Sequence, residues 1–330
     1  MDGGLSSAMM ELFQADQDAG IRRLVANFFS TTATARHPLK IAGPGGAEMA
    51  KDILQPPPKA SRAPLPSSHS GSKTLPGSFK AGFRNLPDFG ASSCGALAVH
   101  LSLHCLGQSI AAEQVAAAVP VRRRRESGSL GAYLLSRSEA GTTAADLQAA
   151  VEELSGGAVV SRFFPTAARP IASVMRLVGE WMEKGGLGVI TYNPQRLPDP
   201  VSGVIPDAWH HELIISHCQS RGLAIASTRQ WQHAGWLERM LDTPRVLLVR
   251  SSDLRPFWES NADLAPILQP SSRDLEPNWI QLNVPGQVHE AMRDESVTHI
   301  QIPAAYTAGI TIYAPKTLQH QLDADHLFTV

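Results

Sequence analysis

The stretch GASSCGALAVHLSLHCLG, residues 90–107, decides the fold. Nearly every position after Cys94 is apolar, so the pattern predicts a helix that is buried on almost all sides. Ser92 or Ser93 is placed to cap its N-terminus, and Gly107 is placed to end it. A helix buried in this way has to be covered by other elements, and we therefore expect it to be the central helix of a globular domain.

The elements that follow this helix come in a clear order, with helices first and then mostly strands. Helical patterns occupy residues 109–119, 142–157, 171–186 and 232–241. Strand patterns occupy residues 157–164, 187–192, 211–216, 223–227 and 245–251, with further strand-like pieces at 279–284, 299–304 and 309–314. This order predicts an α+β fold in which the helices are segregated from an antiparallel sheet.

Composition divides the chain into three parts. Residues 1–80 hold an amphipathic helical pattern over 5–29 and then a stretch rich in Pro, Ser and Gly, which predicts a flexible linker. Residues 81–255 carry the central helix and most of the strand patterns and are predicted to form the main globular domain. Residues 256–330 are expected either to extend the sheet or to form a small accessory domain.

Charge and cysteine content limit the partners and the compartment. The net charge of −1 gives no footprint for nucleic acid, and the basic run from Arg122 to Arg125 is typical of a solvated loop. Three cysteines argue against a disulfide framework. No apolar run is long enough to span a membrane, and the N-terminus lacks the pattern of a Sec-type signal. We expect a cytoplasmic protein, with export by a route that leaves no cleavable signal as the alternative.

Cys94 opens the central helix, where unpaired backbone N–H groups and the helix dipole favour a thiolate. The same N–H groups can receive an oxyanion, and Gly95 leaves room for a substrate backbone. These features predict that Cys94 is a nucleophile. The alternative is that Cys94 packs in the core as a small apolar residue, as we expect for Cys105 at the other end of the helix.

A nucleophilic cysteine needs a base, and DAWHHELIIS (207–216) supplies histidines at the head of an apolar strand. Side chains alternate along a strand, so His211, Leu213 and Ile215 share one face while His210 lies on the other. We predict that His211 is the base and keep His210 as the second choice. A histidine packed in the core or at the surface is the alternative for both.

The helix with Cys-Gly at its start, the GTTAADLQAAVEEL helix and the HHELIISHCQSRGLAIAS hairpin together resemble the papain-like cysteine peptidases. The likeness is to the branch that processes bacteriocin leaders and to the related effector proteases of plant pathogens, and it covers about residues 94–230. It implies a papain-like fold in which Cys94 is the nucleophile and His211 is the general base and acid. It also implies a protein or peptide substrate and no cofactor.

This chain departs from the family pattern at two places. The family has an Asp or Asn after the second hairpin strand to orient the histidine, but the sequence here reads ASTRQW, in which Gln230 is the nearest side-chain amide. The family's oxyanion glutamine before the cysteine is also missing, which leaves Asn85, Ser93 and the Cys94 backbone N–H as candidates. Some papain-like deamidases orient their histidine with glutamine, so glutamine deamidation remains an alternative to cleavage of peptide bonds. A non-catalytic binding protein on the same scaffold is the third possibility.

Clusters of histidine and cysteine raise the question of a metal. His211 and His217 share a strand face but are about 20 Å apart at 3.3 Å per residue, too far to bind one ion. Neither a CxxC nor an HExxH motif occurs, and no glycine-rich loop has the residues that bind phosphate. The sequence therefore predicts no metal or cofactor.

Overall fold

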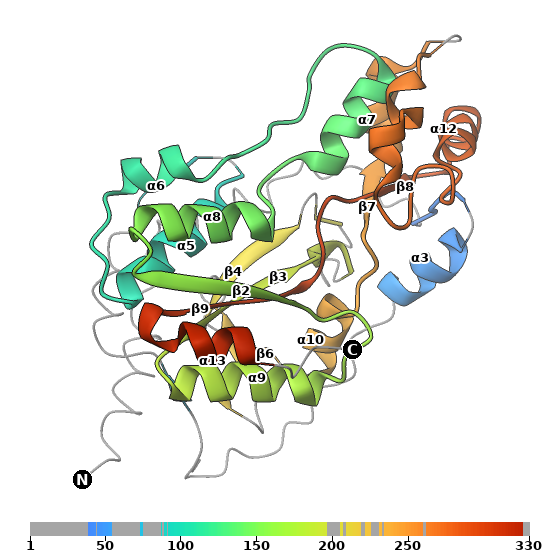
Figure 1. Ribbon diagram of the computed structural model, residues 1–330. Coiled ribbons are helices and arrows are strands. Elements are labelled where there is room, and N and C mark those ends of the chain that lie inside the picture. The colour runs from blue at the N-terminus through green and yellow to red at the C-terminus, as the bar shows by residue number, and fades with distance from the viewer. Residues whose placement is uncertain are drawn as a thin grey trace, which may run out of the picture.

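The computed structural model describes residues 39–43, 45–54, 73–74, 87, 89–90, 92–196, 205–206, 209–218, 222–225, 231–232, 234–259 and 262–325. It is an α+β structure with a main antiparallel sheet, helices on both faces of that sheet, and a second group of elements at one end (Figure 1). The general class predicted from the sequence is therefore confirmed. Within these described ranges, no helix is long and apolar enough to cross a membrane.

The main sheet has seven strands in the order β2-β9-β3-β4-β5-β6, and β1 pairs with β4 in addition. Their bounds are β1 Lys73–Thr74, β2 Val159–Pro165, β3 Leu187–Tyr192, β4 His210–Cys218, β5 Gly222–Ile225, β6 Trp231–Gln232 and β9 Gly309–Pro315. All the pairings are antiparallel. The strand that comes last in the chain, β9, thus lies between β2 and β3, so residues 256–330 help to build the main sheet.

Helices cover the sheet on both sides, as Figure 1 shows. One face carries α5 (Cys94–Cys105), α6 (Ala112–Ala118) and α8 (Ala144–Leu154), and the other carries α9 (Ile171–Glu183), α10 (Ala234–Leu241) and α13 (Gln319–Ala324). On β4, Leu213 and Ile215 pack with α5, while Ile214 packs with α9. Alternation along the strand therefore divides the apolar residues between two cores.

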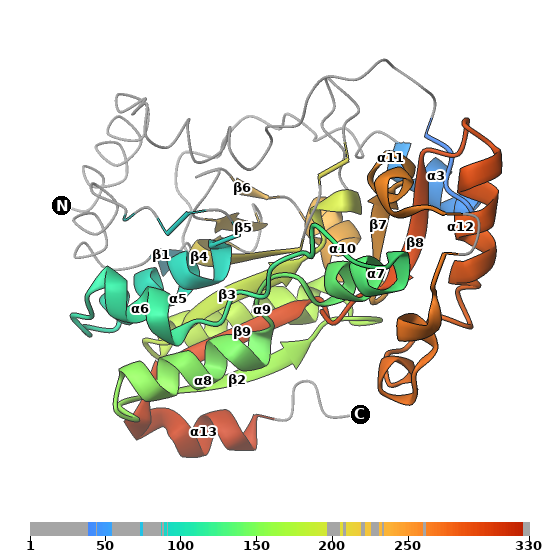
Figure 2. The same cartoon turned by 90° about the horizontal axis from the view of Figure 1, so that it is seen from above.

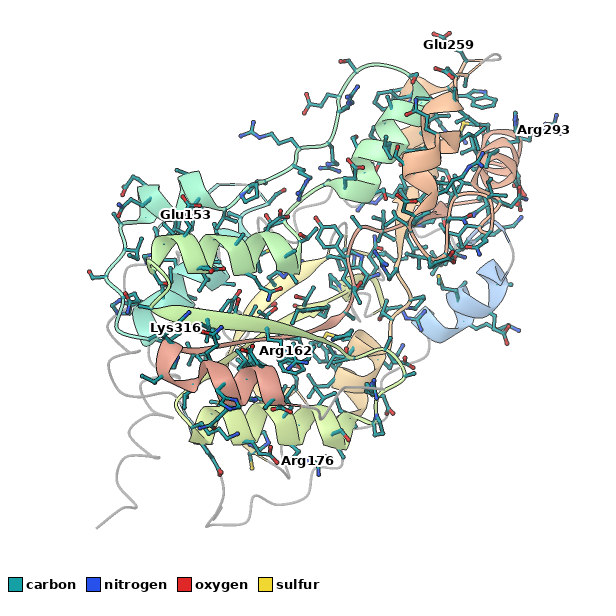
Figure 3. The ribbon with its side chains drawn as sticks, viewed as in Figure 1. Glu153, Arg162, Arg176, Glu259, Arg293 and Lys316 are labelled. Atoms are coloured by element: carbon teal, nitrogen blue, oxygen red, sulfur yellow. The ribbon has the colours of Figure 1, made fainter. Side chains whose placement is uncertain are left out.

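Charged side chains lie on the outer surfaces of the two helix layers. Glu153 on α8 and Arg176 on α9 lie on opposite sides of the molecule, pointing away from the sheet (Figure 3). Arg162 on β2 reaches toward α13, where its guanidinium donates to the main-chain oxygens of Leu322 and Asp323 at 2.7 and 2.9 Å. This contact attaches the last helix to the edge strand of the sheet.

The remaining elements gather at one end of the sheet, in Figure 2 as in Figure 1. They include α3 (Gly46–Leu54), α7 (Leu130–Glu139), β7 (Val246–Arg250), α11 (Ser251–Leu254), α12 (Val284–Arg293) and β8 (His299–Pro303). Short 3₁₀ turns at Arg255–Phe257, Ala265–Leu268 and Pro270–Arg273 belong to the same group, and two others lie at Pro194–Arg196 and Lys316–Leu318. β7 and β8 form a separate two-stranded sheet, and Trp279 is buried in the adjoining core.

Three local expectations were wrong. The 279–284 piece is not a strand: it forms turns that lead into α12, with Asn283 in the left-handed region (φ 50°) and a proline in the first turn. α7 lies where no helical pattern was identified; it begins after Ser129, whose hydroxyl accepts from the Ala132 N–H and caps it. The third expectation was a side-chain cap for α5. Ser93 occupies the N-cap position, but its side chain makes no capping hydrogen bond.

Part of the predicted linker is packed against the fold. Ile41 forms a bridge with His299, and Ile41 and Ala50 share a small apolar core with Ile205 and Leu248. Apolar residues around α3 therefore supply burial that the composition of residues 30–80 as a whole did not indicate. The helical pattern over 5–29 lies outside the described residues.

Candidate active site

Cys94 is the first residue of α5, at the rim of the sheet where β4 begins. The backbone N–H groups of His211, Gly95 and Cys94 itself face its sulfur, and each lowers the pKa of the thiol. Burial outweighs them and raises that pKa to about 11. In this conformation Cys94 is therefore a neutral thiol surrounded by N–H donors.

Close packing of two helix ends defines this rim. A Cβ added to Gly95 would lie 3.0 Å from Leu147 Cδ2 and 3.2 Å from Thr142 Cβ. The start of α5 thus lies directly against the start of α8. Glycine at this position brings Cys94 to the segment that carries Thr142.

His211 is the second residue of β4 and pairs with Thr191 on β3. Its imidazole lies on the α5 face and is 2 % exposed. Nε2 is 2.6 Å from the main-chain oxygen of Thr142, and Nδ1 is 2.9 Å from the hydroxyl oxygen of Thr191. Both ring nitrogens are therefore engaged.

These two contacts assign the protons of the ring. A carbonyl only accepts, so Nε2 carries the proton and donates to Thr142. In the neutral ring Nδ1 then accepts from the Thr191 hydroxyl. Burial lowers the pKa of His211 to about 4, although the hydrogen bond to Thr142 and the charge of Asp146 act in the opposite direction.

The pKa values show which protonation state prevails. Burial raises the thiol pKa to about 11 and lowers the imidazole pKa to about 4, so both shifts favour the thiol and the neutral ring over the ion pair. No hydrogen bond joins the Cys94 thiol to the His211 ring, both of which lie in the described part of the chain. The structure brings the two predicted residues together, but as a neutral pair.

The other predicted histidine lies on the opposite face. His210 pairs with Tyr192 across the strands, their ring centroids are 5.9 Å apart, and burial lowers the pKa of His210 to about 4. Next to it, the Tyr192 hydroxyl donates to Glu212. Neither residue was singled out from the sequence. Burial raises the pKa of Tyr192, and the charge of Glu212 raises it further.

The predicted oxyanion and orienting residues are placed only in part. Gln230 and Asn85 lie outside the described residues. The Ser93 hydroxyl donates to the Gly90 carbonyl at 2.5 Å. The Ser93 hydroxyl proton is therefore used in a hydrogen bond within the chain. Among the described residues, the backbone N–H groups around Cys94 are the remaining candidate donors to an oxyanion.

Sequence reasoning missed Thr142, Thr191 and Tyr306. Tyr306, whose ring centroid is 6.3 Å from that of His211, comes from the loop between β8 and β9. Thr142 follows the glycine of the GTT motif, which is a local signal for a constrained turn, but Thr191 lies in an apolar strand with no such signal. Within the described ranges, no group of three or more His, Cys, Asp or Glu side chains is arranged to hold a metal ion.

Comparison with known proteins adds no relative. No protein-family model matches this chain, and no curated protein or solved structure matches it.

Proposed function

We propose that this protein is a papain-like thiol hydrolase that cleaves peptide bonds of a protein substrate, with Cys94 as nucleophile and His211 as general base and acid. One observation carries the proposal: the Cys94 sulfur, at the start of α5, faces three backbone N–H groups, one of them from His211. N–H groups that face the sulfur stabilise the thiolate, which is the nucleophile that an acyl-transfer site needs.

The protonation of His211 also supports the proposal. A base that takes the thiol proton needs one nitrogen with a lone pair and another that is anchored as a donor. In His211 the anchored nitrogen is Nε2, and the lone pair is on Nδ1, the ring nitrogen nearer to the main chain. The main-chain N–H of the same residue already faces the sulfur.

The reaction follows from these positions. Nδ1 takes the thiol proton while sulfur attacks the substrate carbonyl carbon, and the oxyanion is stabilised by backbone N–H groups at the start of α5. The imidazolium returns the proton to the leaving amine, and the C–N bond breaks. Water, deprotonated by Nδ1, then hydrolyses the thioester and regenerates the thiol. The sequence begins when Nδ1 exchanges its hydrogen-bond donor, so that it accepts from the Cys94 thiol in place of the Thr191 hydroxyl.

The deamidase alternative uses the same steps on a glutamine side chain and differs in the groups that bind the substrate. A second class of function, a non-catalytic binding protein, is favoured by a specific observation. Both nitrogens of the buried His211 ring are satisfied within the fold, which is typical of a structural histidine.

The pH dependence of Cys94 alkylation separates hydrolase from binding protein. We would treat the full chain with iodoacetamide from pH 5 to 9 and follow the Cys94 peptide by mass spectrometry. The wild type is compared with His211→Ala and with His210→Ala, the matched control that removes the neighbouring, half-buried imidazole on the other face of β4.

A hydrolase should show alkylation below pH 8 that His211→Ala slows at least ten-fold and His210→Ala leaves within two-fold. Such alkylation comes from molecules in which the imidazole has taken the thiol proton. If Cys94 reacts only above pH 8, at the same rate in all three proteins, the hydrolase proposal is withdrawn in favour of a binding protein.

A further inference from the structure

The carbonyl that anchors His211 belongs to a short segment, residues 140–143, which we call the strap. The strap is fixed to the preceding loop by main-chain hydrogen bonds in both directions between Arg122 and Gly141, at 2.9 and 2.8 Å. The Thr142 hydroxyl adds a bond of 2.7 Å to the Pro120 carbonyl. The Thr142 carbonyl is thus held in place before it accepts the His211 N–H.

Tyr306 fixes the strap from the other side. Its hydroxyl donates to the Ala140 carbonyl. Gly141 has a φ of 106°, and a Cβ at this position would lie 2.4 Å from the Tyr306 hydroxyl oxygen. Position 141 therefore requires glycine for two reasons. The positive φ strains other residues, and a side chain there would clash with Tyr306.

One carboxylate joins the strap to the loop. Asp146 accepts from the Thr143 N–H and hydroxyl at 2.8 and 2.7 Å, and from both terminal nitrogens of Arg122 at 2.6 and 2.9 Å. Burial alone raises the pKa of Asp146, but the hydrogen bonds from Arg122 and Thr143 lower it to about 2. Asp146 is thus a charged group at neutral pH, and it belongs both to the cap of α8 and to the strap.

We infer that Arg122 and Asp146 are positioning residues for His211: they hold the Thr142 carbonyl, which takes the part that a side-chain acid or amide plays in orienting a catalytic histidine. The inference rests on the proposed function. It makes the orienting group a main-chain atom, which a search of side chains along the sequence does not find.

The charge of Asp146 gives this pair a second effect beyond capping a helix. The carboxylate favours the protonated imidazole by its charge. That form of the ring arises when Nδ1 takes the thiol proton.

The tautomer of the His211 ring is the direct readout, and it can be measured without a substrate. We would record ¹⁵N spectra of histidine side chains in the full chain at pH 7, with the His211 signals assigned by their loss in His211→Gln. The variants are Asp146→Ala, Asp146→Glu, which restores a carboxylate at the same cap position, and Asp294→Ala. The last is the matched control, because Asp294 forms a comparable short ion pair with Lys40 in a different part of the molecule.

The wild type should show the tautomer with the proton on Nε2 as the major form and the Nδ1–H tautomer as a minor but measurable share. Asp146→Ala should increase the share of the Nδ1–H tautomer about five-fold, Asp146→Glu should restore the wild-type pattern, and Asp294→Ala should leave it unchanged. If Asp146→Ala keeps the wild-type tautomer ratio, or if Asp294→Ala changes it equally, the inference is overturned. Failure of the proposed function would appear elsewhere, as alkylation of Cys94 that does not depend on His211.

Discussion

Replacing Thr191 by valine should make Cys94 more reactive. Thr191 is 1 % exposed, and its hydroxyl occupies the Nδ1 lone pair of His211 at 2.9 Å. Valine keeps the shape of the side chain and removes the donor, which leaves Nδ1 buried without a partner at a cost of about 1–3 kcal/mol. The Cys94 thiol, whose sulfur already lies against the main chain of His211, is the donor that can relieve this cost.

The size of the effect follows from that cost. Each 1.36 kcal/mol that favours proton transfer from sulfur to Nδ1 raises the population of thiolate ten-fold, so Thr191→Val should speed alkylation at pH 7 about ten-fold. Thr191→Ser, which keeps the hydroxyl, should remain within two-fold of the wild type. We would measure initial rates with iodoacetamide and identify the labelled peptide by mass spectrometry.

Two internal checks separate activation from loosening of the fold. Cys105 lies at the other end of α5, and burial raises the pKa of its thiol to about 12, so its labelling reports general opening of the helix. The gain at Cys94 should also disappear in the double variant Thr191→Val/His211→Ala. The reasoning is refuted if Thr191→Val labels Cys94 no faster than the wild type, or if the gain survives the loss of His211.

Two further predictions concern stability. Burial lowers the pKa of His210 and His211 from an ordinary value near 6.5 to about 4. Between these pKa values the unfolded chain binds protons that the folded chain does not. Lowering the pH from 7 to 5 should therefore reduce the free energy of unfolding by about 2 kcal/mol for each histidine. Urea unfolding at both pH values should show a smaller decline in His211→Gln than in the wild type. Gly179→Ala should destabilise the fold by about 1–3 kcal/mol, because the added Cβ would lie 2.7 Å from Cε1 of the buried His217, and an unchanged urea midpoint would contradict this packing.

Much of the fold could be predicted because local patterns and tertiary packing agree. The apolar run after Cys94 forms α5, and the alternating residues of β4 divide between the two cores as expected. Prediction failed where a tertiary contact or a proline determines the local secondary structure. Residues 279–284 have the composition of a strand, but Trp279 is buried in the smaller core, and a proline in the first turn of α12 starts a helix.

The site could be predicted only to the level of which residues meet. The positions of Cys94 at a helix start and of His211 at a strand head follow from 3.6-residue and 2-residue periods. The partners of the ring do not, because Thr142 is 69 residues and Thr191 20 residues away in sequence, and one of the two contacts is made by a main-chain oxygen. Hydrogen bonds of this kind depend on backbone paths that no residue type encodes.

The same contacts determine how the site can be switched on. Ionising the thiol by pH alone would need a pH near 11, and protonating the imidazole would need a pH near 4. Neither change creates the ion pair, because at each extreme only one partner is charged. Exchanging the Thr191 hydroxyl for the Cys94 thiol as the donor to Nδ1, in contrast, replaces one hydrogen bond by another and leaves the Nε2 contact with Thr142 in place. Activation of this site should therefore come from a substrate or partner that alters the Thr191 contact, and the Thr191→Val variant reproduces that change without a ligand.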